Sequence, residues 1–269
     1  MVNSTCKDGY MQKLFWNIVA MSAFGVLLGA AAGCTRTGED TPEPPEYVAQ
    51  SSDQSYILQT VGAMHTTVMG GERDAKIELA TLADKPQLNA VGPMTGLSGE
   101  ITIINGRPSL ATVGADGTVK TTTSFETGAP FLVWAEVANW QEETLPASVR
   151  SVADLEAYLT KRGGEKGLTE AFPFTLTGRA ENVGFHVLNA DPEASYPAGM
   201  DAHKQIQVHF DSGPAEVRLV GFYSTTHQGV FIHRGSFTHI HFQTADNALS
   251  GHVESVDFGS GTLVLALPE

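Results

Sequence analysis

From Tyr56 to the end of the chain, short apolar segments alternate with turn residues, and this pattern limits the fold more than any other feature of the sequence. In 100–105, apolar and polar residues nearly alternate before the pair Asn105-Gly106, which is the strongest short signal for a β-hairpin. A second strand is expected at 108–113, and the apolar run 130–137 is typical of a buried strand. The pattern therefore predicts a chain built mainly of short strands joined by tight turns.

One helix is expected among these strands, at 151–162. Ser151 is a suitable N-cap, Asp154 lies three residues later, and Gly163-Gly164 is expected to end the helix. Strands then resume, and we expect them at 172–177, 183–188, 206–211, 216–223, 229–233, 237–243, 252–258 and 262–267. This order predicts an α+β fold with strand-rich mixed sheets in two similar subdomains, about 53–165 and 166–269.

The first 52 residues are excluded from this fold. Lys13 precedes an apolar run that leads to Ala31-Ala32-Gly33-Cys34, which is the layout of a secretory signal. These last four residues resemble the lipoprotein box of bacteria, so we expect a signal peptide at 1–33 and a lipid on Cys34. Residues 34–52 are polar and Pro-rich, and we expect an extended tether that leads to one folded domain at 53–269.

Two other interpretations of the N-terminus stay open. The segment 14–33 is about long enough to cross a bilayer as an anchor, and simple cleavage after an Ala-x-Ala site would release the chain. All three interpretations place the folded part in an extracytoplasmic compartment. In the lipoprotein interpretation, the protein is anchored to the bacterial cell envelope and touches the membrane only through the lipid on Cys34.

Composition excludes several classes of function. The formal net charge of −14 argues against nucleic-acid binding, because little basic charge is available to neutralise phosphates. The only cysteines, Cys6 and Cys34, are too few for a disulfide framework or a four-cysteine zinc module. A Gly-rich phosphate loop and a Walker motif are both missing from the sequence, so a nucleotide cofactor is not expected.

Three histidines near the C-terminus have the spacing of a metal site. His239 and His241 are two residues apart in an expected strand, so their side chains point to the same face. A turn-like stretch at 244–251 leads to His252, which a hairpin would bring back beside the pair. Three imidazoles with an open fourth position are the ligand set of a catalytic zinc, although copper and nickel also suit them.

The remaining histidines are expected to be structural or solvated rather than ligands: His65, His203, His209, His227 and His233. Glu254 shares a strand face with His252, where it either orients an imidazole or is solvated.

Several segments together resemble the bacterial α-acetolactate decarboxylases. The stretch 237–242, Phe-Thr-His-Ile-His-Phe, and the stretch 250–253, Ser-Gly-His-Val, resemble the zinc-binding segment of that family, with the same gap between them. The segment 96–100, Gly-Leu-Ser-Gly-Glu, resembles the family's Leu-Asp-Gly-Glu segment. Ala-Asp-Gly-Thr at 115–118 and Leu-Val-Gly-Phe at 219–222 follow in the expected order, and the resemblance covers roughly 56–268.

The resemblance implies a metal-dependent carboxy-lyase that converts 2-acetolactate, or a similar 2-hydroxy-3-oxo acid, to acetoin and CO₂. In such a site His239, His241 and His252 would bind zinc, and Glu100 would be the carboxyl group that handles the proton. The partner is then a small-molecule substrate, and a homodimer stays open.

The chain also departs from the family. His186 stands where the family has an arginine, Pro93 stands where it has a threonine, and the sequence given ends at Glu269, before the family's tail with a second catalytic glutamate. We expect the positive charge for the substrate carboxylate to come from His186 or from Arg234, which lies five residues before His239. The alternatives are a metal- or ligand-binding lipoprotein without turnover and a different metal-dependent lyase or isomerase.

Overall fold

The computed structural model describes residues 46–47, 55–168, 170–191 and 197–269. The predicted signal peptide at 1–33, the lipidated Cys34 and most of the tether at 34–52 lie outside the described residues. Two residues of the tether form strand β1, Glu46–Tyr47, which pairs with Gln59 and Thr60. In the part of the chain that the structure describes, the helices are too short or too polar to cross a bilayer.

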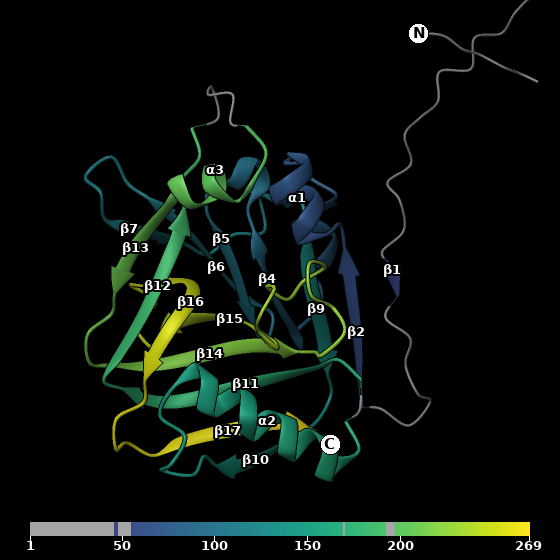
Figure 1. The fold of residues 1–269 in the computed structure, drawn as a ribbon, viewed down its shortest axis with the longest axis vertical. Helices are drawn as coiled ribbons and strands as arrows, with labels where there is room; N and C mark the ends of the chain where they lie inside the picture. Colours follow the sequence, from purple (N-terminus) through teal and green to yellow (C-terminus); the bar gives the residue numbers. More distant parts are fainter. Residues whose placement is uncertain (1–45, 48–54, 169, 192–196) are drawn as a thin grey trace, which may run out of the picture. The chain divides into compact units, whose positions relative to one another are not determined.

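Two antiparallel sheets carry the fold (Figure 1). The seven-stranded sheet has the order β1-β2-β9-β4-β5-β6-β7, and after β1 its strands are β2 Tyr56–Val61, β4 Leu88–Pro93, β5 Glu100–Ile104, β6 Arg107–Val113, β7 Val119–Thr122 and β9 Leu132–Val137. The eight-stranded sheet has the order β10-β17-β11-β14-β15-β16-β12-β13. Its strands are β10 Trp140–Thr144, β11 Phe172–Ala180, β12 Asn182–Leu188, β13 Gln207–Asp211, β14 Ala215–Tyr223, β15 Thr238–Thr244, β16 Ser250–Asp257 and β17 Leu263–Pro268.

Short elements complete the described fold. A small ribbon pairs β3, Ile77–Glu78, with β8, Gly128–Ala129. The α-helices are α1 Met64–Gly70, α2 Val152–Lys166 and α3 Met200–Gln205, and two 3₁₀ turns are η1 Leu79–Leu82 and η2 Thr95–Leu97.

The prediction of an α+β, strand-rich fold is confirmed. The paired strands of both large sheets are antiparallel rather than mixed, because neighbours such as β5 and β6 or β15 and β16 are joined by short turns that reverse the chain. The chain passes from one sheet to the other between Val137 and Trp140. Helix α2 lies over the strands of the eight-stranded sheet (Figure 1).

The hairpin predicted at Asn105-Gly106 is present. Both residues have positive φ, 48° and 71°, which is the backbone that a two-residue primed turn requires. The turn fixes the pairing of β5 with β6, in which Glu100 lies opposite Ala111. The turn therefore determines which residues of β5 face each side of the sheet.

Helix α2 begins as predicted and ends later. Ser151 accepts a hydrogen bond from the backbone N–H of Asp154, and the carboxylate of Asp154 bonds back to Ser151, which completes the capping box. The helix continues through Gly163. That glycine packs against the ring of Phe172, where a Cβ would approach to 2.8 Å, so the absence of a side chain serves packing. It ends at Gly167, whose φ of 75° forms the left-handed C-cap.

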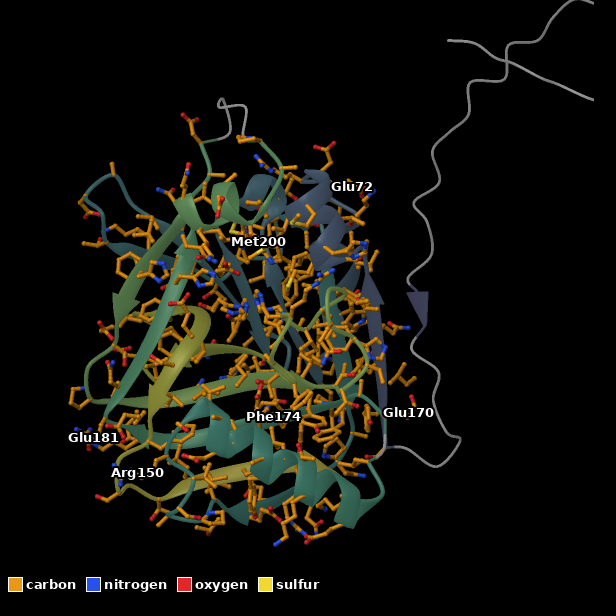
Figure 2. All side chains as sticks on the ribbon, in the orientation of Figure 1. Glu72, Arg150, Glu170, Phe174, Glu181 and Met200 are labelled. Carbon is orange, nitrogen blue, oxygen red and sulfur yellow. The ribbon has the colours of Figure 1, made fainter. Side chains whose placement is uncertain are left out.

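The core divides along the two faces of the seven-stranded sheet. Ile101 and Ile103 on β5 pack into a cluster with Leu79 and Trp134. The alternate residues, Glu100 and Thr102, face the other way, toward β15 and β16 of the eight-stranded sheet. Figure 2 shows the side chains that fill the space around the sheets, with Phe174 inside and Glu72, Arg150 and Glu181 near the edges. A carboxylate is thus carried on a strand face that meets the other sheet.

Candidate metal and acid site

The β15–β16 hairpin brings the three predicted ligands together. His239 and His241 point to the same face of β15, and His241 lies directly opposite His252 in the strand register. The Nε2 atoms of His239 and His241 are 3.2 Å apart, and Nδ1 of His252 is 3.3 Å from Nε2 of His241. Three ring nitrogens from two neighbouring strands therefore converge on one point.

These spacings fit a tetrahedral metal ion. Zn–N bonds of about 2.0–2.1 Å place the nitrogens of a tetrahedral zinc about 3.3–3.4 Å apart. The two measured nitrogen distances, 3.2 Å and 3.3 Å, are close to that value. The positions of the ring nitrogens of His239, His241 and His252 are therefore suited to zinc.

The environment keeps these imidazoles neutral, which is the form that binds a metal. His239, His241 and His252 are 2%, 0% and 8% exposed. Burial lowers the pKa of His241 to about 3, and burial likewise lowers the pKa of His239 and His252 well below the ordinary value. Their lone pairs are thus free of protons at neutral pH.

The second nitrogen of His241 is held from the opposite sheet. Its Nδ1 lies 3.2 Å from Oγ1 of Thr102, and the same oxygen accepts a hydrogen bond from the hydroxyl of Ser250 at 3.1 Å. A partner on the outer ring nitrogen orients the imidazole and strengthens it as a ligand. Thr102 therefore fixes the direction in which Nε2 of His241 points.

Glu100 lies beside the imidazoles in the buried space between the sheets. Its carboxylate oxygens are 3.7 Å from Nε2 of His241 and 3.7 Å from Nε2 of His186. Burial raises the pKa of the Glu100 carboxyl well above its ordinary value, against the smaller effect of a backbone hydrogen bond from Leu188. The side chain is 3% exposed overall, so its surroundings favour the protonated form of the Glu100 carboxyl over the charged form.

His186 connects this acid to the surface. It lies opposite His252 in the pairing of β12 with β16, and its Nδ1 is 3.1 Å from Oε1 of Glu254. The other oxygen of Glu254 is 2.8 Å from Nδ1 of His209. The side chains of His186, Glu254 and His209 are 5%, 39% and 55% exposed, so the row runs from the buried acid to solvent. Glu254 orients His186 rather than the ligand His252.

Two hollows meet at these side chains. A small inner cavity of about 20 Å³, enough for one water molecule, is lined by Glu100, His186, His239 and His252, and by Pro93 at the position of the family's threonine. An outer pocket of about 320 Å³ shares His186 and His252 with it. The outer volume is within the range of small-ligand pockets.

Arg234 lies away from the acid. It is exposed and lines a different pocket, of about 340 Å³, together with residues of α1 and α3. His186 lines both hollows at the site, whereas Arg234 lines neither. Of the two cations predicted for the substrate carboxylate, His186 is the one the structure brings to Glu100.

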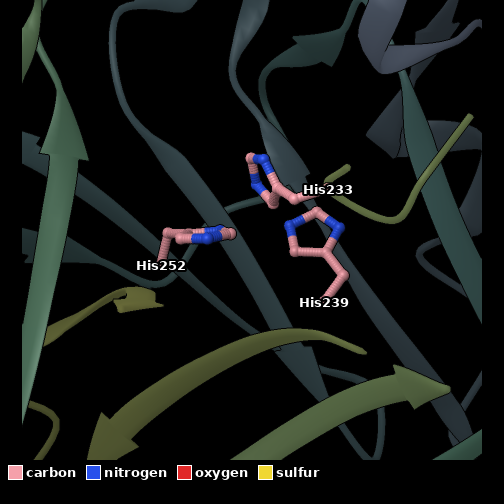
Figure 3. Close-up of side chains that lie close together, drawn as sticks. All are labelled: His233, His239 and His252. Atoms are coloured by element: carbon pink, nitrogen blue, oxygen red, sulfur yellow. The ribbon is translucent and has the colours of Figure 1, made fainter. Parts of the chain in front are cut away.

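His233 was expected to be structural, and its placement is different. Ring nitrogens of His233, His239 and His252 lie within 4.8 Å of one another, and Figure 3 shows the three rings facing a common point. The segment 229–233, expected as a strand, is instead a tight loop in which the carbonyl of His227 accepts three backbone N–H groups. Strand spacing could not identify His233, because a loop brings it to the site.

A family model and several solved structures match the chain. The family model described as alpha-acetolactate decarboxylase matches residues 60–267. A Staphylococcus aureus protein of unknown function, similar to alpha-acetolactate decarboxylase, has a TM-score of 0.62 and 18% identity over 78% of this chain and 84% of its own. The alpha-acetolactate decarboxylase of Bacillus subtilis strain 168 has a TM-score of 0.60 and 17% identity over 78% of this chain and 85% of its own.

No curated protein sequence matches the chain. The two solved structures show that the fold is shared, and the family model spans nearly the whole of the described domain, including Glu100 and all three predicted ligands. The chain therefore belongs to the alpha-acetolactate decarboxylase family.

Proposed function

We propose that this chain is a zinc-dependent carboxy-lyase that converts 2-acetolactate, or a closely similar 2-hydroxy-3-oxo acid, to acetoin and CO₂. The observation that carries the proposal is the buried Glu100 carboxyl 3.7 Å from Nε2 of His241. That nitrogen lies 3.2 Å and 3.3 Å from ring nitrogens of His239 and His252, which is the spacing of zinc ligands. Family membership supports the reaction class.

His239, His241 and His252 would hold the metal in this proposal. A metal held there would supply Lewis-acid stabilisation of the negative charge that develops as the C–C bond of the substrate breaks. The outer pocket of about 320 Å³ has room for such a substrate beside the inner ring atoms.

Glu100 supplies the proton. Decarboxylation leaves the electron pair of the broken C–C bond on the substrate carbon, and one proton must be added to that carbon to give the neutral product. A carboxyl group whose pKa burial has raised is suited to donate it, since it still carries its proton at neutral pH. Glu100 then recovers a proton from water before the next turnover.

His186 is the group we assign to the substrate carboxylate. Glu254 accepts a hydrogen bond from Nδ1 of His186, which leaves Nε2 directed at the inner cavity. With Nδ1 held by Glu254 in this way, the ring presents Nε2 to an anion bound in the cavity.

The test is a metal analysis followed by an assay. The full chain is purified in detergent, its zinc is measured by elemental analysis, and racemic acetolactate is added while CO₂ is recorded. We expect stoichiometric zinc and CO₂ release that a chelator abolishes and added zinc restores. Stoichiometric zinc without CO₂ would instead favour a metal-binding protein without turnover or a lyase for another substrate, and absence of metal would reject the metal centre.

We also propose that the chain is exported and lipid-anchored to the cell envelope through Cys34, on the basis of the apolar run and the Ala-Ala-Gly-Cys box. Labelling with a radioactive fatty acid tests this. The unaltered chain should take up the label and fractionate with membranes, and Cys34→Ser should lose both properties; label on the Cys34→Ser chain would contradict the proposal.

A further inference from the structure

We infer that His233 is a fourth ligand of the metal centre, supplied by the loop that joins β14 to β15. The inference rests on the proposed metal centre and adds a residue that neither the strand spacing nor the resemblance assigns. It concerns this chain's own donor set, in which the ring nitrogens of His233, His239 and His252 lie within 4.8 Å of one another and those of His239 and His252 also lie beside His241.

The position of the His233 ring carries the inference. Its centroid lies 4.9 Å from that of His252 and 5.8 Å from that of His239, at steep angles of 76° and 79°. Rings that meet edge to face at these distances bring nitrogens within reach of a shared ion, and ring nitrogens of the three residues lie within 4.8 Å of one another. Figure 3 shows His233 approaching from the side opposite the strand that carries His239.

The loop is built so that this ring is held in place. The two residues before His233, Phe231 and Ile232, are both fully buried and anchor the chain in the core. Gly229, at a φ of 82°, makes the tight turn that the loop requires.

Helix α1 fixes the same loop from outside. The backbone N–H of Met64 donates to the carbonyl of Val230 at 2.7 Å, and that of His65 donates to the carbonyl of Gly229 at 2.8 Å. A loop bonded to a helix on one side and buried in the core on the other positions its next side chain closely. His233 is that side chain.

A fourth imidazole changes what the centre does when no substrate is bound. A tetrahedral zinc is complete with four protein ligands, whereas catalysis requires a position for substrate. His239, His241 and His252 are fixed by strand pairing, and His233 is carried by a loop. In a metal centre held by these four residues, His233 would therefore be the protein ligand that gives up its position to a chelating hydroxy acid.

His203 provides a matched control. It lines the same inner and outer hollows as His233 and is also partly buried, but it is not among the ring nitrogens that converge. Removing either histidine opens a similar space at the same place. Only removal of a ligand changes how the metal is held.

The experiment measures the metal directly rather than activity. The full chain and its His233→Ala, His233→Gln and His203→Ala variants are loaded with zinc, and affinity is measured by competition with a chromophoric chelator. Cobalt(II) loading gives visible absorption bands that report the ligand set. We expect both His233 variants to bind zinc at least about 100-fold more weakly than the unaltered chain, with shifted cobalt bands. His203→Ala should keep the affinity and the spectrum.

Added imidazole sharpens the result. It should restore the cobalt spectrum of His233→Ala, because the small ring can enter the space that the side chain leaves, and it should not change His203→Ala. His233→Gln keeps most of the side-chain volume and guards against a folding defect, which far-ultraviolet circular dichroism checks in each variant.

Each remaining outcome counts against the inference in a distinct way. If both His233 variants bind zinc as tightly as the unaltered chain with an unchanged cobalt spectrum, His233 is not a ligand, while the three-histidine centre and the proposed reaction stand. If the unaltered chain binds neither zinc nor cobalt, the metal centre itself is rejected and this inference with it.

Discussion

The two sides of the site are built in different ways. The imidazole side comes from one hairpin, in which His241 and His252 are direct neighbours across β15 and β16. The acid side combines Glu100 from the seven-stranded sheet with His186 and Glu254 from two strands of the other sheet. The predicted metal ligands thus lie close together in the sequence, whereas the contacts of Glu100 depend on how the two sheets pack together.

The largest effect should follow from breaking the imidazole side. In His241→Ala, the nitrogen that lies 3.2 Å and 3.3 Å from its two neighbours is lost, and the space around it is fully buried. We expect loss of stoichiometric zinc by elemental analysis and CO₂ release at background level. His209→Ala, at the exposed end of the histidine row, is the control and should keep its zinc. Full zinc in His241→Ala would show that the hairpin does not hold the metal.

Breaking the acid side should leave the metal in place. Glu100→Gln keeps the size of the side chain and removes its acidic proton, so we expect turnover to fall by about 10²–10⁴-fold while zinc content is unchanged. The matched control is Glu142→Gln, at an exposed position on β10. Loss of zinc in Glu100→Gln would instead show that Glu100 is itself needed for metal binding, so that the acid side could not be separated from the imidazole side.

A smaller effect is expected from the cation that faces the substrate carboxylate. His186→Ala removes the imidazole between Glu100 and Glu254, and the apparent KM for acetolactate should rise by roughly 10–100-fold, the range for a lost hydrogen bond to a charged group. Steady-state kinetics at saturating zinc measure this. An unchanged KM would remove His186 from the binding of the carboxylate.

The two sides should also oppose each other in their dependence on pH. The pKa of His241 is lowered to about 3 and that of His233 to about 4, below the unfolded value of 6.5. Their contribution to stability is present above pH 6.5 and is lost as the pH falls toward 4 and 3. The raised pKa of Glu100 acts in the other direction, since its contribution is present below 4.5 and is lost as the pH rises.

Urea unfolding of the metal-free chain between pH 7.5 and pH 4 tests the balance. Because several imidazoles oppose one carboxyl group, we expect the free energy of unfolding to fall as the pH is lowered through this range. In Glu100→Gln the fall should be steeper, because the opposing contribution is gone. A free energy that rises on acidification would show that the acid side dominates.

The smallest effect should come from Arg234. It is exposed and lines neither hollow at the site, so Arg234→Ala should change the apparent KM for acetolactate by less than about threefold, as expected for an exposed charge. The same assay as for His186→Ala applies. A rise in KM comparable with that of His186→Ala would show that Arg234, rather than His186, binds the substrate carboxylate.

What could be predicted from the sequence follows the same division. Three features depend only on residues near one another in the sequence: the β5–β6 hairpin, the start of α2 and the convergence of His241 with His252. Period-two alternation with short turns predicts the two hairpins, and the capping residues predict the start of α2. The predicted end of α2 at Gly163-Gly164 was wrong, since the helix continues to Lys166. Gly163 makes room for the Phe172 ring and does not act as a stop signal.

Contacts between residues far apart in the sequence could not be predicted from such local patterns. The contact of Thr102 with His241 joins residues 139 positions apart, and no pattern within one strand specifies it. His233 reaches the site through a loop whose course depends on helix α1 and on the burial of Phe231. The role of Glu100 could be predicted only from the resemblance to a family, since a single glutamate at the start of a strand carries no signal of its own.

The tight hairpin of β15 and β16 has a consequence for the order of assembly. His241 and His252 are separated by 11 positions, whereas Thr102 and His241 are separated by 139. Chain entropy for closing a loop grows with the logarithm of its length, so the longer closure costs about 2 kcal/mol more. The half of the site that we propose to hold an ion is therefore the cheaper half to form, and an ion captured there early would help to order the remainder of the chain around it.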